Sequence, residues 1–274
     1  MKSNQPIGIF DSGIGGLTVA KAVKNLLPNE QLIYFGDTAH LPYGDKSVAA
    51  IQAYSVRITE MLLRRKCKVI LIACNSASSA AFELVTEYVG KKAHVLDVIN
   101  PTIDFIRERH LNSRIGLIGT KQTVSSLVYE KMIRELQQNN VFNAVATPLL
   151  VPMIEEGFSG NHVSEEIIKT YLSDDSISEI DALILGCTHY PIIKSEISQY
   201  YSNESRKVEV IDSAEKVAGA LKGYLEFNQL IAESAAEKDE FLVSDFTESF
   251  EKTTKIFFGK EVHLEKIPIW DEMN

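Results

Sequence analysis

Eight short runs of almost unbroken apolar residues, separated by helix-length segments, constrain the fold of this chain most strongly. They lie at 7–10, 31–36, 68–73, 94–99, 114–119, 143–148, 182–186 and 208–212. A strand with one face in solvent alternates apolar and polar residues, whereas a parallel strand covered by helices on both faces is apolar throughout. The alternation of strand and helix patterns therefore predicts an α/β fold with doubly wound, mostly parallel sheets.

The segment after residue 46 shows the helical periodicity most clearly. Ser47 is placed to cap its first turn, because a serine side chain can accept a hydrogen bond from the backbone there. One face of this predicted helix holds Val48, Ile51, Ser55, Ile58 and Leu62. This mostly apolar face is expected to pack on a sheet.

A weak internal repeat predicts two similar domains. The strand–turn–helix pattern that begins at Ile7 recurs at Ile115, 108 residues later, and Cys74 and Cys187 follow strand-like runs 113 residues apart. A chain of 274 residues is long enough for two domains. We expect one domain from 1–97 plus 211–274 and the other from 98–210, with the active site in the cleft between them. The last stretch would complete the first domain with a helix at 213–230 and a strand and helix within 241–259.

Composition and charge exclude several classes of protein. The chain carries 28 basic and 37 acidic residues, a formal charge of −9, and has no block of Lys and Arg of the kind that nucleic-acid binders use. Three cysteines provide no disulfide framework and fit a reducing compartment. The N-terminus lacks the apolar segment of a signal peptide, and no run is long enough to span a membrane. A cytoplasmic protein is expected, and a homodimer is compatible with the sequence.

Two cysteines are the first candidate functional residues. Cys74 in "LIACNSASSA" and Cys187 in "LILGCTHYPI" both follow a predicted strand, at the carboxyl edge where parallel α/β sheets bind ligands. His189 follows two residues after the second cysteine, and an imidazole can take a proton from a thiol or stabilise its thiolate. Free cysteines are also common as small buried apolar residues, which is the alternative for both. Cys67 precedes its strand and is expected to be structural.

The glycine-rich segment "FDSGIGGLTVAK" allows two interpretations. It partly matches the dinucleotide fingerprint, and Asp37 follows the second strand as a ribose-binding acid would. However, Thr18 occupies the third glycine position, and Asp11 at the strand end would repel a pyrophosphate. We therefore favour a tight turn that directs Asp11 and Ser12 into the cleft. No spacing typical of a zinc site occurs, so no metal is expected.

Taken together, five motifs resemble those of the glutamate racemase family. They are "FDSGIGGLTV", "YFGDTAHLPYG", "ACNSAS", "PLLVPMIEEG" and "LGCTHYP", in that order along nearly the whole chain. The resemblance implies a cofactor-independent enzyme that interconverts L- and D-glutamate and supplies D-glutamate for bacterial peptidoglycan. Aspartate racemases share the cysteine pair but match these motifs less well.

The resemblance also implies roles for individual residues. The catalytic set would be Cys74, Cys187, Asp11, Glu155 and His189. Substrate contacts would come from Asp11, Ser12, Pro42, Tyr43, Gly44, Asn75, Ser76, Thr120, Thr123, Thr188 and His189. One departure is Ser76, where the family pattern has a threonine, so that a hydroxyl is kept and a methyl is lost.

Racemisation explains why two thiols would be needed. A two-base site removes the α-proton from one face and returns a proton to the other, without turning the substrate over. An unperturbed cysteine pKa of about 8.5 leaves thiol and thiolate both accessible near neutral pH. A helix beginning after each cysteine would favour the thiolate, and Asp11 and His189 would adjust the proton balance on their own sides. The motifs contain no arginine, so the substrate carboxylates would be held by backbone N–H groups and hydroxyls.

Three other functions remain open on the sequence alone. The first is racemisation of another amino acid, such as aspartate. The second is nicotinamide-dependent oxidation and reduction. The third is a two-lobed binding protein with inert cysteines.

Overall fold

A computed structural model of the protein describes residues 1–234 and 238–270. The first part of the chain forms β1 (Ile7–Asp11), α1 (Leu17–Leu26), β2 (Leu32–Gly36), η1 (Tyr43–Asp45), α2 (Val48–Arg64), β3 (Val69–Ile72), α3 (Asn75–Val89) and β4 (His94–Asp97). The central part forms α4 (Asn100–Arg109), β5 (Arg114–Gly119), α5 (Lys121–Ser125), α6 (Val128–Glu135), β6 (Val141–Ala146), α7 (Leu150–Glu155), α8 (His162–Leu172), η2 (Asp175–Ile177), β7 (Ala182–Gly186), η3 (Tyr190–Ile193), α9 (Lys194–Asn203) and β8 (Glu209–Asp212). The last part forms α10 (Ser213–Phe227), β9 (Glu240–Val243), α11 (Glu248–Phe258) and β10 (Glu265–Lys266).

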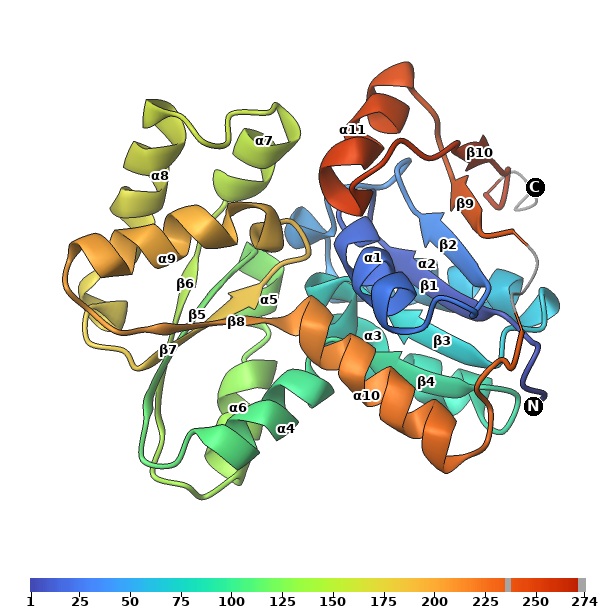
Figure 1. The fold of residues 1–274 in the computed structure, drawn as a ribbon, viewed down its shortest axis with the longest axis horizontal. Helices are drawn as coiled ribbons and strands as arrows, with labels where there is room; N and C mark the ends of the chain where they lie inside the picture. The colour runs from blue at the N-terminus through green and yellow to red at the C-terminus, as the bar shows by residue number, and fades with distance from the viewer. Residues whose placement is uncertain (235–237, 271–274) are drawn as a thin grey trace.

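The strands form two separate sheets, which confirms the predicted fold class of two doubly wound α/β domains (Figure 1). The first sheet has the order β10-β9-β2-β1-β3-β4, and the second has the order β6-β5-β7-β8. Every ladder between described strands is parallel. We call the parts built on these sheets the first and second domain; the boundaries after residues 97 and 210 stay a prediction.

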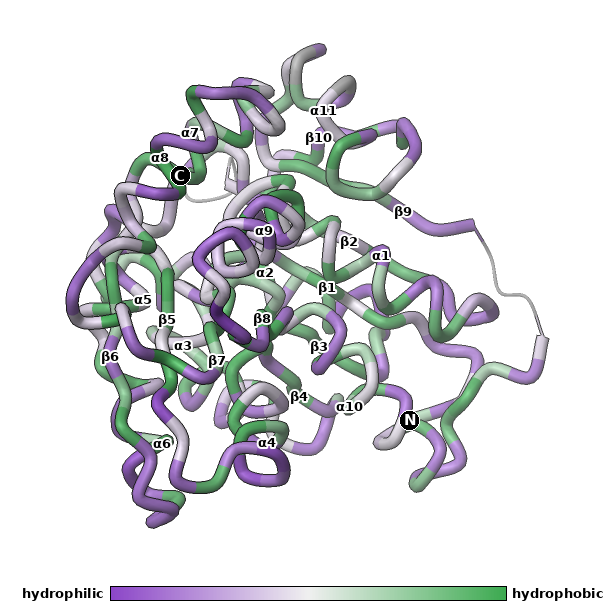
Figure 2. Tube along the Cα trace, turned by 60° about the vertical axis from the view of Figure 1, so that its left-hand side comes forward, coloured by the Kyte–Doolittle hydropathy of each residue, from purple (hydrophilic) through white to green (hydrophobic). Residues whose placement is uncertain are grey.

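Helices cover both faces of the first sheet, and the strand residues alternate between them. Ile7 and Ile9 of β1 belong to the core that includes α1 and α10, whereas Phe10 belongs to the core under α2 and α3. Both cores are apolar, which is why the strands are near-continuous apolar runs. In Figure 2 the central strands are mainly hydrophobic, while outer helices such as α9 carry both hydrophobic and hydrophilic residues.

Local sequence explains the start of α2. The Ser47 side chain accepts a hydrogen bond from the Ala50 backbone N–H at the start of α2, as predicted. Of the predicted buried face of α2, four residues are buried, but Val48 in the first turn is 46% exposed. The predicted strand at 143–148 lies two residues earlier, as β6, and β10 was not predicted because Glu265 and Lys266 carry no apolar signal.

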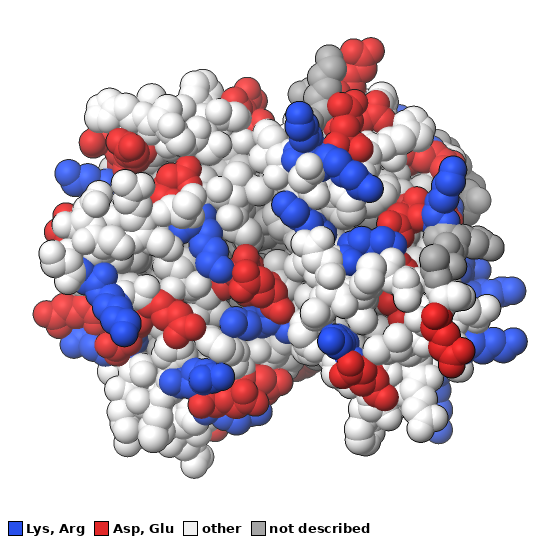
Figure 3. Space-filling model, in the orientation of Figure 1, with Lys and Arg blue, Asp and Glu red and all other residues white. Residues whose placement is uncertain are grey.

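Charged side chains of both signs are mixed on the surface. Figure 3 shows acidic and basic side chains interspersed over one face, without a continuous basic patch. Across 1–234 and 238–270, none of the helices combines the length and the hydropathy needed to cross a bilayer.

Candidate active site

The carboxyl ends of strands from both sheets meet at one small cavity, of which water can reach about 40 Å³. Its walls come from the loops after β1, β2, β3, β5 and β7, and from α7. The lining residues are Ser12, Gly13, Leu41, Pro42, Tyr43, Gly44, Cys74, Asn75, Ser76, Thr120, Val151, Glu155, Gly186, Cys187, Thr188 and His189. Such a volume holds only a few water molecules.

Cys74 occupies the N-cap position of α3, because the apolar β3 ends two residues before it and the helix begins at Asn75. Its Sγ lies 3.7 Å from Oγ of Ser12, within hydrogen-bonding distance. Burial, followed by the negative charge of Asp11, raises the pKa of the Cys74 thiol to about 12, although the backbone at Ala77 and the Ser12 hydroxyl act in the opposite direction. Cys74 is therefore a neutral thiol at neutral pH in this arrangement, and its pKa departs from the unperturbed value assumed from the sequence.

Asp11 lies beneath the cavity rather than in its wall. It ends β1, is fully buried, and its Oδ2 accepts hydrogen bonds from the backbone N–H groups of Gly13 (3.2 Å) and Gly16 (3.0 Å). Its Oδ1 has no hydrogen-bond partner among the described residues. A side chain at Gly16 would clash, since its Cβ would lie 2.5 Å from Cβ of Asp11. The glycine-rich turn therefore wraps around a carboxylate of the protein itself, which leaves no place there for a pyrophosphate.

The second cysteine has different neighbours. Sγ of Cys187 lies 3.7 Å from Nδ1 of His189, and Nε2 of that imidazole lies 2.9 Å from Oε1 of Glu155. Burial opposes a charge on His189, but hydrogen bonds and charge interactions with Cys187 and Glu155 outweigh it and raise the pKa of the imidazole to about 10. His189 is thus a cation at neutral pH.

Only one of the two cysteines has an α-helix beginning directly behind it. After Cys187 the chain forms the short η3, and α9 begins only at Lys194. The prediction of a helix N-terminus after each cysteine is therefore wrong for Cys187, where the His189 cation provides the nearby positive charge.

Hydroxyl groups join the two domains beside the cavity. Oγ of Ser76, in the first turn of α3, lies 2.8 Å from Oγ1 of Thr120, which caps α5 of the second domain. Thr123 lies behind them, 3.0 Å from Oγ1 of Thr120, and does not line the cavity. Asn75 lines the cavity, with its Oδ1 accepting a 2.8 Å hydrogen bond from the Tyr129 hydroxyl and its Nδ2 without a partner among the described residues. That N–H₂ group is free to donate to a ligand.

Glycines allow close approach at two points of the domain boundary. A Cβ on Gly15 would lie 2.3 Å from Cε1 of His189, so the β1–α1 turn can pack on the imidazole only with glycine there. A Cβ on Gly44 would lie 2.9 Å from Cβ of Thr120. In addition, the Thr18 hydroxyl donates a 2.8 Å hydrogen bond to the backbone oxygen of Thr188. These contacts hold the two domains together beside the cavity.

Sequence reasoning missed several residues of the site. Four further residues line the cavity: Gly13, Leu41, Val151 and Gly186. All four lie within or next to the quoted motifs, so motif position was the available signal. The contact of Tyr129 with Asn75 links segments 54 residues apart and had no local signal, whereas the contact of Asp37 with Tyr43 lies within one quoted motif.

The lining residues have a chemistry suited to proton transfer on a small polar molecule. They include two thiols, an imidazole, a carboxylate, several hydroxyls and an amide, but neither lysine nor arginine. Within the described part of the chain, no group of three His, Cys, Asp or Glu side chains could hold a metal ion. A thiol next to a carboxylate and a thiol next to an imidazole are candidates for general acids and bases.

Comparisons with known proteins agree with this chemistry. The sequence profile described as Asp/Glu/Hydantoin racemase matches residues 17–221. A glutamate racemase of Chlorobaculum parvum is 41% identical over 263 residues, covering 96% of this chain and 95% of the relative. The crystal structure of glutamate racemase from Francisella tularensis in complex with D-glutamate has a TM-score of 0.89 at 38% identity, covering 98% of this chain and 99% of the other. The glutamate racemase of Thermus thermophilus in complex with β-chloro-D-alanine has a TM-score of 0.87 at 36% identity, covering 97% and 98%.

Proposed function

Because the chain belongs to the Asp/Glu/hydantoin racemase family, and its full-length relatives are glutamate racemases, we propose that it interconverts L- and D-glutamate by a two-cysteine, cofactor-independent mechanism. The observation that carries the proposal is the position of Cys74 and Cys187 in the wall of one cavity, each contributed by a different domain. Two similar domains provide two similar groups for the two faces of the α-carbon.

In this mechanism one cysteine removes the α-proton as a thiolate and the other donates a proton as a thiol. The His189 cation, 3.7 Å from Sγ of Cys187, stabilises negative charge on that sulfur. The high pKa of Cys74 keeps its proton available for donation. In the reverse reaction the two cysteines exchange roles, so the proton balance must shift from one sulfur to the other in each cycle.

The substrate carboxylates would be bound without a lysine or an arginine in the cavity wall. Support comes from the partnerless Asn75 Nδ2 and from the hydroxyls of Ser12, Thr120 and Thr188. The cavity has little free volume, so we propose that the domains open to admit glutamate and close around it. Closure excludes water and strengthens the interactions that stabilise the carbanion.

We further propose that the product D-glutamate supplies peptidoglycan synthesis in the cytoplasm. The three cysteines of the chain are unpaired thiols, which fits a reducing compartment.

A circular dichroism assay of purified protein with L-glutamate and no added cofactor tests the proposed reaction. Loss of optical activity, and the same end point from D-glutamate, are expected. Parallel incubation with each enantiomer of aspartate tests the main alternative, and faster turnover of aspartate than of glutamate would overturn the assignment of the substrate.

A further inference from the structure

We propose that Asp37 is a positioning residue for this active site: it holds the Pro42–Gly44 loop against the second domain, and Trp270 locks its carboxylate in place. The proposal rests on the proposed function in that it takes the cavity as the substrate site. Asp37 itself does not line the cavity, so any effect it has on the reaction must pass through other residues.

Asp37 is a fully buried carboxylate on which distant segments converge. It follows β2 directly, and its Oδ2 accepts a 2.6 Å hydrogen bond from the Tyr43 hydroxyl. Its Oδ1 accepts hydrogen bonds from the Ser244 hydroxyl (2.7 Å) and from Trp270 Nε1–H (3.0 Å). Nδ1 of His40 lies 3.0 Å from Oδ2. Charge-assisted hydrogen bonds are stronger than neutral ones, so this carboxylate fixes the positions of all four partners.

Tyr43 transmits this constraint to the cavity. Its side chain is almost fully buried, and burial, followed by the charge of Asp37, raises the pKa of its hydroxyl well above the usual range. The hydroxyl therefore stays protonated and donates permanently to Asp37. Tyr43 and its neighbour Gly44 both line the cavity.

The same loop contacts the second domain. Gly44 packs on Thr120 at the start of α5, so closely that a Cβ would lie 2.9 Å from Cβ of that threonine. The next residue, Asp45, lies 3.4 Å from Nζ of Lys121 on the same helix. The Pro42–Gly44 loop thus forms part of the contact that closes the cavity, and its position decides how well the cavity closes.

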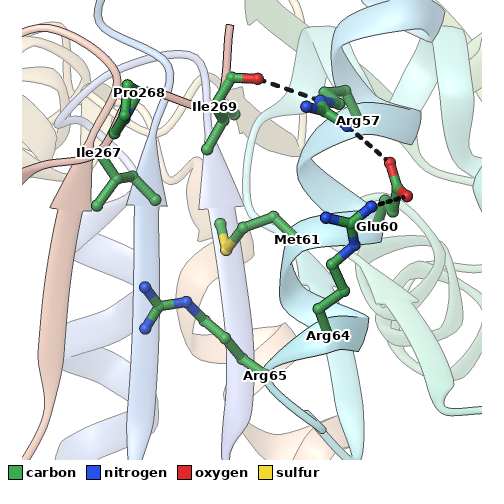
Figure 4. Close-up of a pocket in the computed structure, with 8 residues that line it drawn as sticks. All are labelled: Arg57, Glu60, Met61, Arg64, Arg65, Ile267, Pro268 and Ile269. Atoms are coloured by element: carbon green, nitrogen blue, oxygen red, sulfur yellow. Dashed lines mark hydrogen bonds and ion pairs between the residues drawn. The ribbon is translucent and has the colours of Figure 1, made fainter. Parts of the chain in front are cut away.

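Hydrogen bonds hold the C-terminal segment, residues 267–270, close to Asp37. The Ile267 backbone N–H donates to the Val243 backbone oxygen at 2.9 Å. Arg57 Nε donates to the Ile269 backbone oxygen at 3.1 Å (Figure 4). Trp270 then packs edge-on against His40, with ring centroids 4.7 Å apart. The segment is thus bound to β9 through Val243 and to α2 through Arg57. These two contacts place the Trp270 indole next to Asp37.

The hollow drawn in Figure 4 does not by itself indicate an anion site. Arg57 and Arg64 are both paired with Glu60, and Arg65 is paired with Glu240. The hydrogen bond from Arg57 to Ile269 in this region attaches residues 267–269 to α2.

A set of substitutions separates positioning from general stability. Asp37→Asn and Tyr43→Phe remove opposite partners of one hydrogen bond, and the double variant tests whether they act together. Asp239→Asn is the matched control, because Asp239 accepts hydrogen bonds from the Leu32 backbone N–H (3.0 Å) and Lys24 (2.9 Å) at the opposite end of the same strand β2. Trp270→Phe keeps an aromatic ring but removes the indole N–H together with one of the two fused rings, and it leaves the Asp37 carboxylate in place, so it serves as a second variant if Asp37→Asn does not fold.

The first measurement is glutamate racemisation. Asp37→Asn should raise KM about tenfold while kcat changes less than about twofold, because a loosened wall weakens binding more than chemistry. In the Tyr43→Phe background, Asp37→Asn should add little further effect on KM. Multiplication of the two single effects would show that Asp37 does not act through Tyr43.

The second measurement does not depend on activity. Alkylation of each cysteine by iodoacetamide is followed by mass spectrometry in the ligand-free protein. Cys74 should react several-fold faster in Asp37→Asn and Trp270→Phe than in wild type or Asp239→Asn, while buried Cys67, outside the cavity wall, reports general unfolding. If wild type proved inactive, the proposed function would fall, but this measurement would still decide the positioning role. Unchanged Cys74 reactivity in both variants would overturn it.

Discussion

The two cysteines of the cavity occupy equivalent places in two similar domains, but their surroundings differ. Cys74 begins α3 and lies beside Ser12 above the buried Asp11 carboxylate, and its pKa is raised to about 12. Cys187 is followed by a short η3 and lies beside the His189 cation, which is paired with Glu155. The two domains share a fold, but the Asp11 carboxylate lies near the Cys74 thiol and the His189 cation lies near the Cys187 thiol.

This difference bears on a reaction that must work in both directions. With identical surroundings, the two sulfurs would compete for one proton without preference. In the proposed mechanism the unequal neighbours define a resting state, with the proton held on Cys74 and positive charge near Cys187. Substrate binding must then change this balance for the reverse direction.

Removing either thiol should have the largest effect. Cys74→Ala and Cys187→Ala should each lower kcat by more than about 10³-fold in both directions, because a two-base reaction needs both groups. Initial rates from L- and D-glutamate measure this, with Cys67→Ala as the matched control outside the cavity wall. A variant that kept substantial activity in either direction would exclude its cysteine from the reaction.

Loss of the cation should have the next largest effect. His189→Asn should lower kcat about 10²-fold with a smaller change in KM, because the imidazolium assists proton transfer. Glu155→Gln should have a weaker effect, since this carboxylate side chain is 36% exposed and acts through His189. A rise in KM with kcat unchanged would assign His189 to binding instead.

The raised pKa of His189 also predicts a pH dependence of stability. The folded-state pKa of about 10 exceeds an unfolded value of about 6.5, so the proton stabilises the folded protein. This contribution is fully present below about pH 6.5 and is lost as the pH rises towards 10. The free energy of unfolding of wild type, measured against His189→Asn by denaturant titration, should decline over this window. A constant difference between the two proteins would contradict the assigned charge.

Removal of the negative charge of Asp11, which lies near Cys74, should have a smaller effect on kcat. Asp11→Asn removes a negative charge that raises the pKa of this thiol, so the pKa of Cys74 should fall. We expect kcat to decrease about tenfold, because the proton balance between the cysteines is altered. Thiolate absorbance in a Cys67→Ala, Cys187→Ala background measures the pKa, and an upward shift would contradict the account.

The smallest effect should come from Ser76→Thr. Threonine adds a methyl group but retains the hydroxyl, which in Ser76 lies 2.8 Å from Oγ1 of Thr120. Both kcat and KM should therefore remain within about threefold of wild type. Alanine at this position removes the hydroxyl and should raise KM more than threonine does. Equal effects of the two substitutions would show that the hydroxyl has no part in binding.

The sequence was sufficient to predict the strands, because parallel strands buried on both faces leave continuous apolar runs. It missed β10, because Glu265 and Lys266 pair with β9 but form no apolar run. Motifs indicated the cysteines and the loops around them. The protonation of Cys74, by contrast, depends on burial and on Asp11, 63 positions earlier in the chain. The link from Trp270 to Asp37 spans 233 positions and equally leaves no local pattern.

The central claim is that Cys74 and Cys187 act on opposite faces of the α-carbon. Racemisation of each glutamate enantiomer in deuterated water, stopped early and analysed by NMR of the separated enantiomers, tests it most directly. The account predicts deuterium at the α-carbon of the product and little in the recovered substrate, because the product receives its proton from a solvent-exchanged thiol while the first base tends to return the original proton. Equal early labelling of substrate and product, from either enantiomer, would contradict the two-base assignment.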